Sequence, residues 1–308
     1  MTLTLNPALD HNVQADRLVF EDRAYILSTG ETAGGRGINA SVVLHAFGAE
    51  TKAITATGGR NGKRFEELLE MEAFPVEYVK IKHNLRHNLT IVDKQGLAVK
   101  LNERGPHLQA SELLRFEKVL SENLEGAKWL MICGSLPPGV PSNFYGRIIR
   151  QAQAQNVLTL LDTDGDALLH GLEAGPSAVA PNQAEAERLL NRALITRPHF
   201  HDAARRIVAM GARWVILSLG SRGAVGATSE LLVEAVPPAI DAVCPIGAGD
   251  ALAAAFTWAV AEDKPFEDAV RWGVAAGTAS AALPGIQFPS MAQTQEIYSR
   301  VEVRTLRA

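Results

Sequence analysis

The chain has 308 residues, 47% of them hydrophobic, which is enough apolar content to bury a large core. Its formal net charge of −4 at neutral pH argues against nucleic acid as the main partner. There are only two cysteines, no signal peptide at the N-terminus and no run of about 20 apolar residues that could span a membrane, so we expect a globular cytoplasmic protein.

Short apolar runs recur along the chain, with the length and composition typical of buried strands. These runs are Thr2–Leu5, Ala53–Thr57, Trp129–Cys133, Val157–Leu161, Ala178–Ala180 and Trp214–Leu219. Between them, apolar residues repeat at helical spacing, as in Leu113, Phe116, Leu120 and Leu124. This alternation predicts one α/β domain over residues 1–308, in which a central, mainly parallel sheet is flanked by helices on both faces.

Two segments depart from the strand–helix alternation. Val13–Ser28 and His87–Leu101 alternate polar and apolar residues, and the second contains turn-forming residues at Asp93–Gly96. We predict antiparallel strands here, forming a small β lid from about residues 11–30 and 83–103. The unpaired strand edges of such a lid would be covered if two chains paired across a two-fold axis, which predicts a homodimer through the lid.

Polar clusters follow several of the predicted strands, where ligands bind in open α/β sheets. Each cluster alone could be ordinary turn chemistry, but five of them at one edge of the sheet indicate a ligand site. The clusters are Asn6 with Asp10, Gly134–Gly139, Asp162–Asp166, Asn182–Glu185 and Ser218–Gly220.

A glycine-rich loop near the C-terminus, Cys244–Asp250, is followed by the small, apolar run Ala251–Ala261. This pattern predicts a loop that opens a helix, whose unpaired N–H groups favour an anion. A carboxylate in the first turn, Asp250, would then be placed to act as a base in phosphate transfer. The alternative is a plain turn in which Asp250 caps the helix.

A second glycine-rich stretch, Ala33–Ala40, satisfies only a loose dinucleotide-binding pattern, because the segment before it is polar. The pair Gly62-Lys63 resembles half of a phosphate-binding loop but lacks the following serine or threonine. We reject both interpretations. A glycine pair before an amphipathic helix can instead admit a sugar against bare backbone, with Asn39 supplying a donor and an acceptor.

Taken together, the stretch Ala33–Ala40 and the loop Gly247–Asp250 resemble the two signatures of the ribokinase (PfkB-type) carbohydrate kinases, and the resemblance covers nearly the whole chain. Three further stretches, Thr4–Asp10, Asn102–Pro106 and Gly134–Gly139, are similar to the branch that contains 1-phosphofructokinase, tagatose-6-phosphate kinase and the minor bacterial 6-phosphofructokinase. The resemblance implies a ribokinase-like fold and an enzyme that uses ATP, Mg²⁺ and a monovalent cation to convert a ketohexose monophosphate into the bisphosphate. Fructose 1-phosphate is the favoured substrate, with tagatose 6-phosphate and fructose 6-phosphate as alternatives.

The resemblance also implies roles for individual residues. Asp250 would be the base, and the N–H groups of Gly247, Ala248 and Gly249 would stabilise the transferred phosphoryl group. The implied sugar contacts are Asp10, Gly34, Gly35, Asn39, Asn88 and Ser135, with Arg23 and Arg86 binding the phosphate of the substrate. The implied ATP contacts are Asn182, Ser218, Gly220, Gly223 and Ala276, while Glu185 and Asn182 would hold magnesium, largely through water.

The sequence departs from the family pattern at three places. Arg36 stands where lysine or glycine is usual, Ala180 replaces a common lysine, and Cys244-Pro245 replaces the usual Asp/Ser-Thr pair. Arg104 lies within the Asn-Glu-x-Gly-Pro motif but receives no role. Two alternatives therefore stay open, a kinase of an unphosphorylated sugar or nucleoside and a non-catalytic sugar-phosphate sensor.

Overall fold

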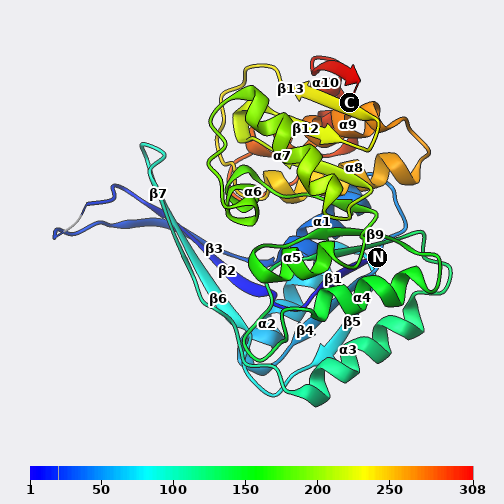
Figure 1. Ribbon diagram of the computed structural model, residues 1–308. Coiled ribbons are helices and arrows are strands. Elements are labelled where there is room, and N and C mark those ends of the chain that lie inside the picture. The colour runs from blue at the N-terminus through cyan, green and yellow to red at the C-terminus, as the bar shows by residue number, and fades with distance from the viewer. Residues whose placement is uncertain (20, 308) are drawn as a thin grey trace.

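The computed structural model describes residues 1–19 and 21–307, and a ten-stranded sheet runs through its body in the order β14-β13-β12-β11-β10-β9-β8-β1-β4-β5 (Figure 1). All strand pairs from β11 to β5 are parallel, whereas β11, β12, β13 and β14 pair antiparallel. The strands are β1 (Thr2–Thr4), β4 (Ala53–Thr57), β5 (Val76–Lys80), β8 (Trp129–Cys133), β9 (Leu158–Asp162), β10 (Ala178–Val179), β11 (Trp214–Ser218), β12 (Ala224–Ala227), β13 (Leu231–Val236) and β14 (Glu302–Arg307). The predicted mainly parallel sheet is confirmed, and all six predicted strands occur in it.

Helices cover both faces of this sheet, and an apolar core fills each side. Phe256 and Trp272 are buried on one side, and Phe116 and Ile149 on the other. The first side is covered by α1 (Arg36–Ala46), α8 (Ala248–Ala261) and α9 (Phe266–Ala281), with α10 (Met291–Tyr298) against α9. The second is covered by α2 (Gly59–Leu69), α3 (Ala110–Asn123), α4 (Phe144–Gln153), α5 (Gly165–Leu172), α6 (Gln183–Leu190) and α7 (Arg197–Ala209). Among the described residues, no helix is both long and apolar enough to cross a membrane.

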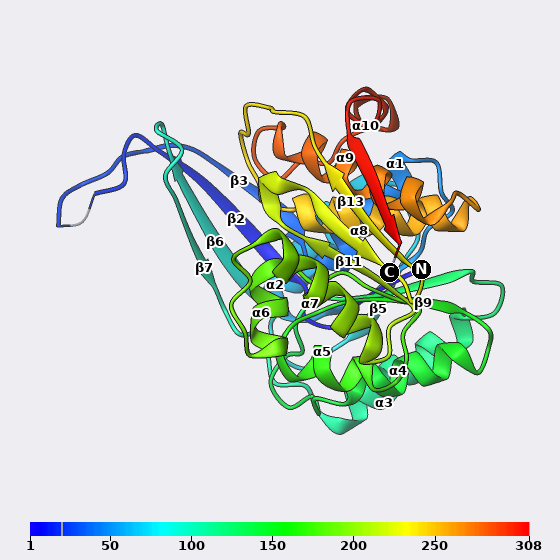
Figure 2. The same cartoon turned by 45° about the horizontal axis from the view of Figure 1, so that its top comes forward.

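A second, four-stranded sheet projects from the body as a long blade (Figures 1 and 2). We call it the small sheet; its strands lie in the order β3-β2-β6-β7. They are β2 (Ala8–Ala15), β3 (Ile26–Gly34), β6 (Arg86–Asp93) and β7 (Ala98–Asn102). Both hairpins are antiparallel, as predicted, but β2 and β6 pair parallel. The small sheet covers the segments predicted to form a lid, and its role as a lid stays a prediction.

Candidate active site

The two glycine signatures meet at the carboxyl-end edge of the large sheet. Asn39 lies in the first turn of α1, and Asp250 lies in the first turn of α8. The Asn39 Nδ2 atom donates a hydrogen bond of 2.6 Å to Oδ2 of Asp250, across 211 residues of chain. Both helices lie on the same face of the sheet, so their N-termini bring the predicted base and a predicted sugar contact together.

The N-terminus of α8 is open to an approaching anion. Gly247 takes the left-handed backbone conformation, with φ of 85°, so that the loop can turn sharply into the helix. A Cβ atom added to Gly249 would meet no heavy atom within 4 Å. Within the described residues, no side chain caps this helix, and Asp250 instead accepts the hydrogen bond from Asn39. This geometry favours the anion site over a capped turn.

Asp250 carries a strongly perturbed carboxyl group. Burial and the negative charge of Asp162 raise its pKa to about 7, although Arg36 and the hydrogen bond from Asn39 favour the ionised form. A carboxylate whose pKa lies near neutral pH can both accept a proton and release it, as general base catalysis requires.

Arg36 links α1 to two carboxylates on other elements. Its Nη1 atom lies 2.7 Å from Oδ1 of Asp162, at the end of β9, and its Nη2 atom lies 2.8 Å from Oε1 of Glu185, in α6. The other Glu185 oxygen accepts a hydrogen bond of 2.9 Å from the backbone N–H of Asn182, the residue that precedes α6. Asp162 received no individual role from the sequence; its position in one of the strand-end clusters was the only signal.

The carboxylates of Asp162 and Glu185 suit magnesium but form a sparse set. Both are buried and face the same cation, Arg36. Over residues 1–19 and 21–307, no group of three or more His, Cys, Asp or Glu side chains could hold a metal ion. Because magnesium usually keeps several waters and binds through one or two carboxylates and the phosphates of a nucleotide, this pair fits it.

Asp10 and Asn88 lie on the inner end of the small sheet, where it joins the body. Asn88 Nδ2 donates a hydrogen bond of 2.7 Å to Asp10 Oδ1, and both side chains are buried. A Cβ atom added to Gly34 would lie 2.0 Å from Oδ2 of Asp10, and one added to Gly35 would lie 2.9 Å from Thr4. Only glycine fits at these two positions, because a larger residue would collide with Asp10 or Thr4. The expectation that Gly34 and Gly35 present bare backbone to a sugar stays a prediction.

A cavity of about 510 Å³ lies beside Arg86 and Ser135. Arg86 donates hydrogen bonds to the backbone oxygens of Asn6 (2.8 Å) and Glu103 (3.0 Å), which fix the position of its guanidinium group. Arg104, to which the sequence gave no role, lines the same cavity. These cationic side chains come from separate segments of the chain, so only the fold brings them together.

The structure does not bring Arg23 to this cavity. Arg23 is exposed and lies in the segment between β2 and β3, at the outer end of the small sheet (Figure 1). The predicted convergence of Arg23 with Arg86 is therefore wrong within one chain. The reason is the length of the hairpin, which carries its turn far from the body.

The residues predicted to contact ATP fall into two groups. Ser218, at the end of β11, pairs with Asn182 in an isolated parallel bridge, and Gly220 begins the exposed turn that follows. In contrast, Ala276 is completely buried in the core between α9 and the sheet, and Gly223 is buried against Ala235. The prediction that Ala276 contacts the adenine is corrected, since it offers no surface to a ligand in this conformation.

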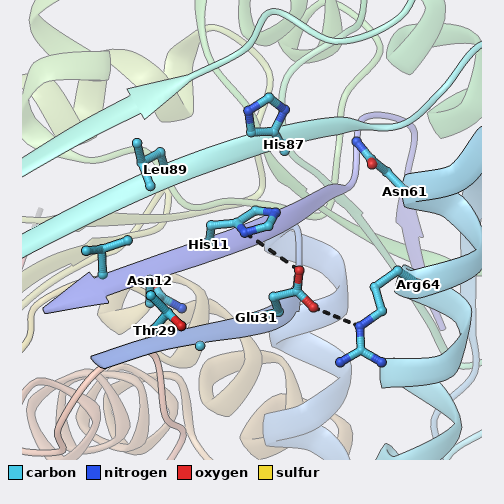
Figure 3. Close-up of a pocket in the computed structure, with 10 residues that line it drawn as sticks. His11, Asn12, Thr29, Glu31, Asn61, Arg64, His87 and Leu89 are labelled. Carbon is cyan, nitrogen blue, oxygen red and sulfur yellow. Dashed lines mark hydrogen bonds and ion pairs between the residues drawn. The ribbon is translucent and has the colours of Figure 1, made fainter. Parts of the chain in front are cut away.

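A further cavity, of about 780 Å³, lies on the face of the small sheet opposite to the one that carries Asp10 and Asn88 (Figure 3). Within it, Glu31 lies 3.7 Å from His11 and 2.8 Å from Arg64. Because neighbouring residues of a strand point to opposite faces, His11 faces away from Asp10. This cavity is thus separate from the candidate active site.

Comparison with known proteins identifies the family of the chain. The model of the family described as "pfkB family carbohydrate kinase" matches residues 4–293. The chain is 35% identical, over 97% of both proteins, to ATP-dependent 6-phosphofructokinase isozyme 2 of Escherichia coli. It is 31% identical, over 91% of both, to 1-phosphofructokinase of Borreliella burgdorferi. A crystal structure of Escherichia coli phosphofructokinase-2 in complex with potassium superposes with a TM-score of 0.91, at 34% identity over 97% of both chains.

Proposed function

Because the chain belongs to the pfkB family of carbohydrate kinases, we propose that it transfers the γ-phosphoryl group of ATP to a ketohexose monophosphate and forms the bisphosphate. The relatives support a sugar-phosphate kinase of the phosphofructokinase type. The observation that carries the proposal is the junction of Asp250 with Asn39 at the open N-terminus of α8.

In the proposed reaction, Asp250 takes the proton of the sugar hydroxyl while the oxygen of that hydroxyl bonds to the γ-phosphorus of ATP. The bond between the γ-phosphorus and the bridging oxygen breaks, and ADP leaves with that oxygen. Asn39 orients the carboxylate, and the N–H groups of the loop Gly247–Gly249 stabilise the charge on the phosphoryl oxygens. Bound magnesium would neutralise the nucleotide phosphates, and Asp162, Glu185 and Asn182 would hold it, mainly through water.

The cavity beside Arg86 supports a substrate that already carries a phosphate. Two arginines, Arg86 and Arg104, line this cavity together with Asp164 and Asp166. The planar donors of arginine match phosphate oxygens, so a phosphate group fits the arginine side of the cavity. Asp10 and Asn88 would bind the sugar hydroxyls between this phosphate and Asp250. Fructose 1-phosphate, favoured by the motif Asn102–Pro106, and fructose 6-phosphate, named by the relative at 35% identity, both give fructose 1,6-bisphosphate.

An ADP-release assay tests the proposed function. The panel should contain fructose 1-phosphate, fructose 6-phosphate, tagatose 6-phosphate, free fructose, ribose and adenosine, each with ATP and Mg²⁺ in potassium and in sodium buffer. We expect turnover of at least one ketohexose monophosphate with kcat/KM at least a hundredfold above that of the free sugars. Turnover of only free sugars or adenosine would contradict the proposal, and so would binding of a sugar phosphate without any ADP release.

We also propose that two chains pair through the small sheet. Leu101 pairs with Leu89 and Val99 pairs with Ile91 in the ladder between β6 and β7, which gives one apolar face. Leu101 and Val99 are exposed, as is Ile26 at the start of β3. This face continues from the cavity of Figure 3 and lies away from Asp10, so a second copy could cover it without blocking the candidate active site.

Replacing Leu101 by glutamate should convert a dimer into a monomer, because the charge would be buried in the apolar contact. Light scattering coupled to size-exclusion chromatography measures the mass. Leu114→Glu is the matched control, since Leu114 is similarly exposed but lies on α3. An unchanged mass for Leu101→Glu, or an equal change for both variants, would argue against pairing through this face.

A further inference from the structure

Arg36 is surrounded by negative charge at the candidate metal site. Its guanidinium group contacts Asp162 and Glu185 at 2.7 Å and 2.8 Å, and the charge of Asp250 also acts on it. The Asp162 and Glu185 side chains are only 8% and 2% exposed, while Arg36 is 31% exposed. Arg36 is thus the cation that compensates two buried carboxylates.

Without Arg36, neither carboxylate would have an ion-pair partner among the described residues, and two buried, uncompensated charges are strongly unfavourable. A divalent cation at this position would meet the same electrostatic need. Both Glu185 oxygens already accept hydrogen bonds, one from Arg36 and one from the backbone N–H of Asn182. Asn182 also receives the reciprocal bond of the helix cap, so Arg36 is the more easily displaced of the two partners.

We propose that Arg36 is a positioning residue that takes the place of the divalent cation in the ligand-free protein and gives up Glu185 when magnesium binds. The inference rests on the proposed kinase function only for the identity of this cation. Arg36 is the first residue of α1, directly after Gly34-Gly35, and Asn39 lies in the same turn. Release of Arg36 would therefore shift the first turn of α1 and with it Asn39, which donates the hydrogen bond to Asp250.

Metal binding without nucleotide tests this role. In EDTA, Arg36→Gln should melt at a lower temperature than the unaltered protein, and Mg²⁺ should recover more than half of the loss while shifting the unaltered protein little. Titration with Mn²⁺ should give a Kd at least ten times lower for Arg36→Gln. Arg64→Gln is the matched control, because Arg64 also bridges two carboxylates but is more exposed. It contacts Glu31, as Figure 3 shows, and Glu67.

Equal Mg²⁺ shifts in Arg36→Gln and the unaltered protein would overturn the inference, as would weaker Mn²⁺ binding in the variant. If Arg36→Gln does not fold, Arg36→Lys is the deciding variant, because lysine is a point charge that cannot contact both carboxylates in the planar, two-pronged manner of arginine. The Arg36→Lys protein should bind Mn²⁺ more tightly than the unaltered protein. An equal or weaker Mn²⁺ affinity would overturn the inference. Turnover in the substrate panel with unchanged metal binding in the variant would defeat this inference alone. The expected metal behaviour without turnover of any sugar phosphate would contradict the proposed function alone.

Discussion

Asparagine in place of Asp250 should lower kcat by about a thousandfold, within the range that loss of a general base usually causes. The amide cannot take the proton of the attacking hydroxyl, whereas the N–H groups of the helix start remain in place. ATP affinity, measured by calorimetry, should stay within about twofold because no ATP contact is proposed for this carboxylate. Glu262→Gln, at the other end of α8, is the control and should leave turnover unchanged. A kcat for Asp250→Asn within tenfold of the unaltered enzyme would exclude Asp250 as the base.

The Asp250→Asn protein should be more stable than the unaltered protein at alkaline pH. The pKa of Asp250 is about 7 in the folded protein, against an ordinary value of 3.8. A raised carboxyl pKa favours the folded state at low pH, and that stability is lost as the pH rises through about 7. Asparagine stays neutral at every pH. The melting temperature of the Asp250→Asn protein should therefore exceed that of the unaltered protein at pH 8, and this difference in melting temperature should shrink toward pH 5. A constant difference would contradict the buried-charge account.

The central strands could be predicted from sequence because both of their faces are buried. Continuous apolar runs such as Trp129–Cys133 carry that signal by themselves. The edge strand β5, Val76–Lys80, mixes charged and apolar residues, so it gives no such run and was missed. The parallel pairing of β2 with β6 was missed for another reason: it depends on where the body places the two hairpins.

The candidate site divides in a similar way. Asp250 and Asn39 belong to local glycine motifs that are visible in the sequence, and the fold brings them together. The contacts of Arg36 with Asp162 and Glu185 join three distant segments, so no local pattern could have predicted them. Arg23 and Ala276 show the reverse error, since hairpin length and helix packing decide whether a residue at a family position can reach a ligand.

Alanine in place of Arg86 should lower kcat/KM for the phosphorylated substrate by about a hundredfold to a thousandfold. The estimate corresponds to the loss of one or two hydrogen bonds between charged groups, each worth about 1.5–3 kcal/mol. Burial lowers the pKa of Arg86, although Asp10 and Glu103 oppose this, so the group is a partly desolvated cation whose attraction for a phosphate is weakly screened. Free fructose has no phosphate, and its small kcat/KM should change less than tenfold.

The control for this prediction must separate phosphate binding from folding, because Arg86 also holds the backbone of Asn6 and Glu103. Arg150→Ala removes an exposed arginine of α4 and should change neither substrate. Arg104→Ala removes the second cation that lines the cavity. Because the Arg104 side chain is exposed, this change should leave the melting temperature unchanged while it raises KM for the phosphosugar about tenfold. Equal losses for fructose and its phosphate in Arg86→Ala, with no effect of Arg104→Ala, would mean that the phosphate binds elsewhere. If both variants lose kcat/KM for the phosphorylated substrate but not for free fructose, the cavity is what distinguishes sugar phosphates from free sugars.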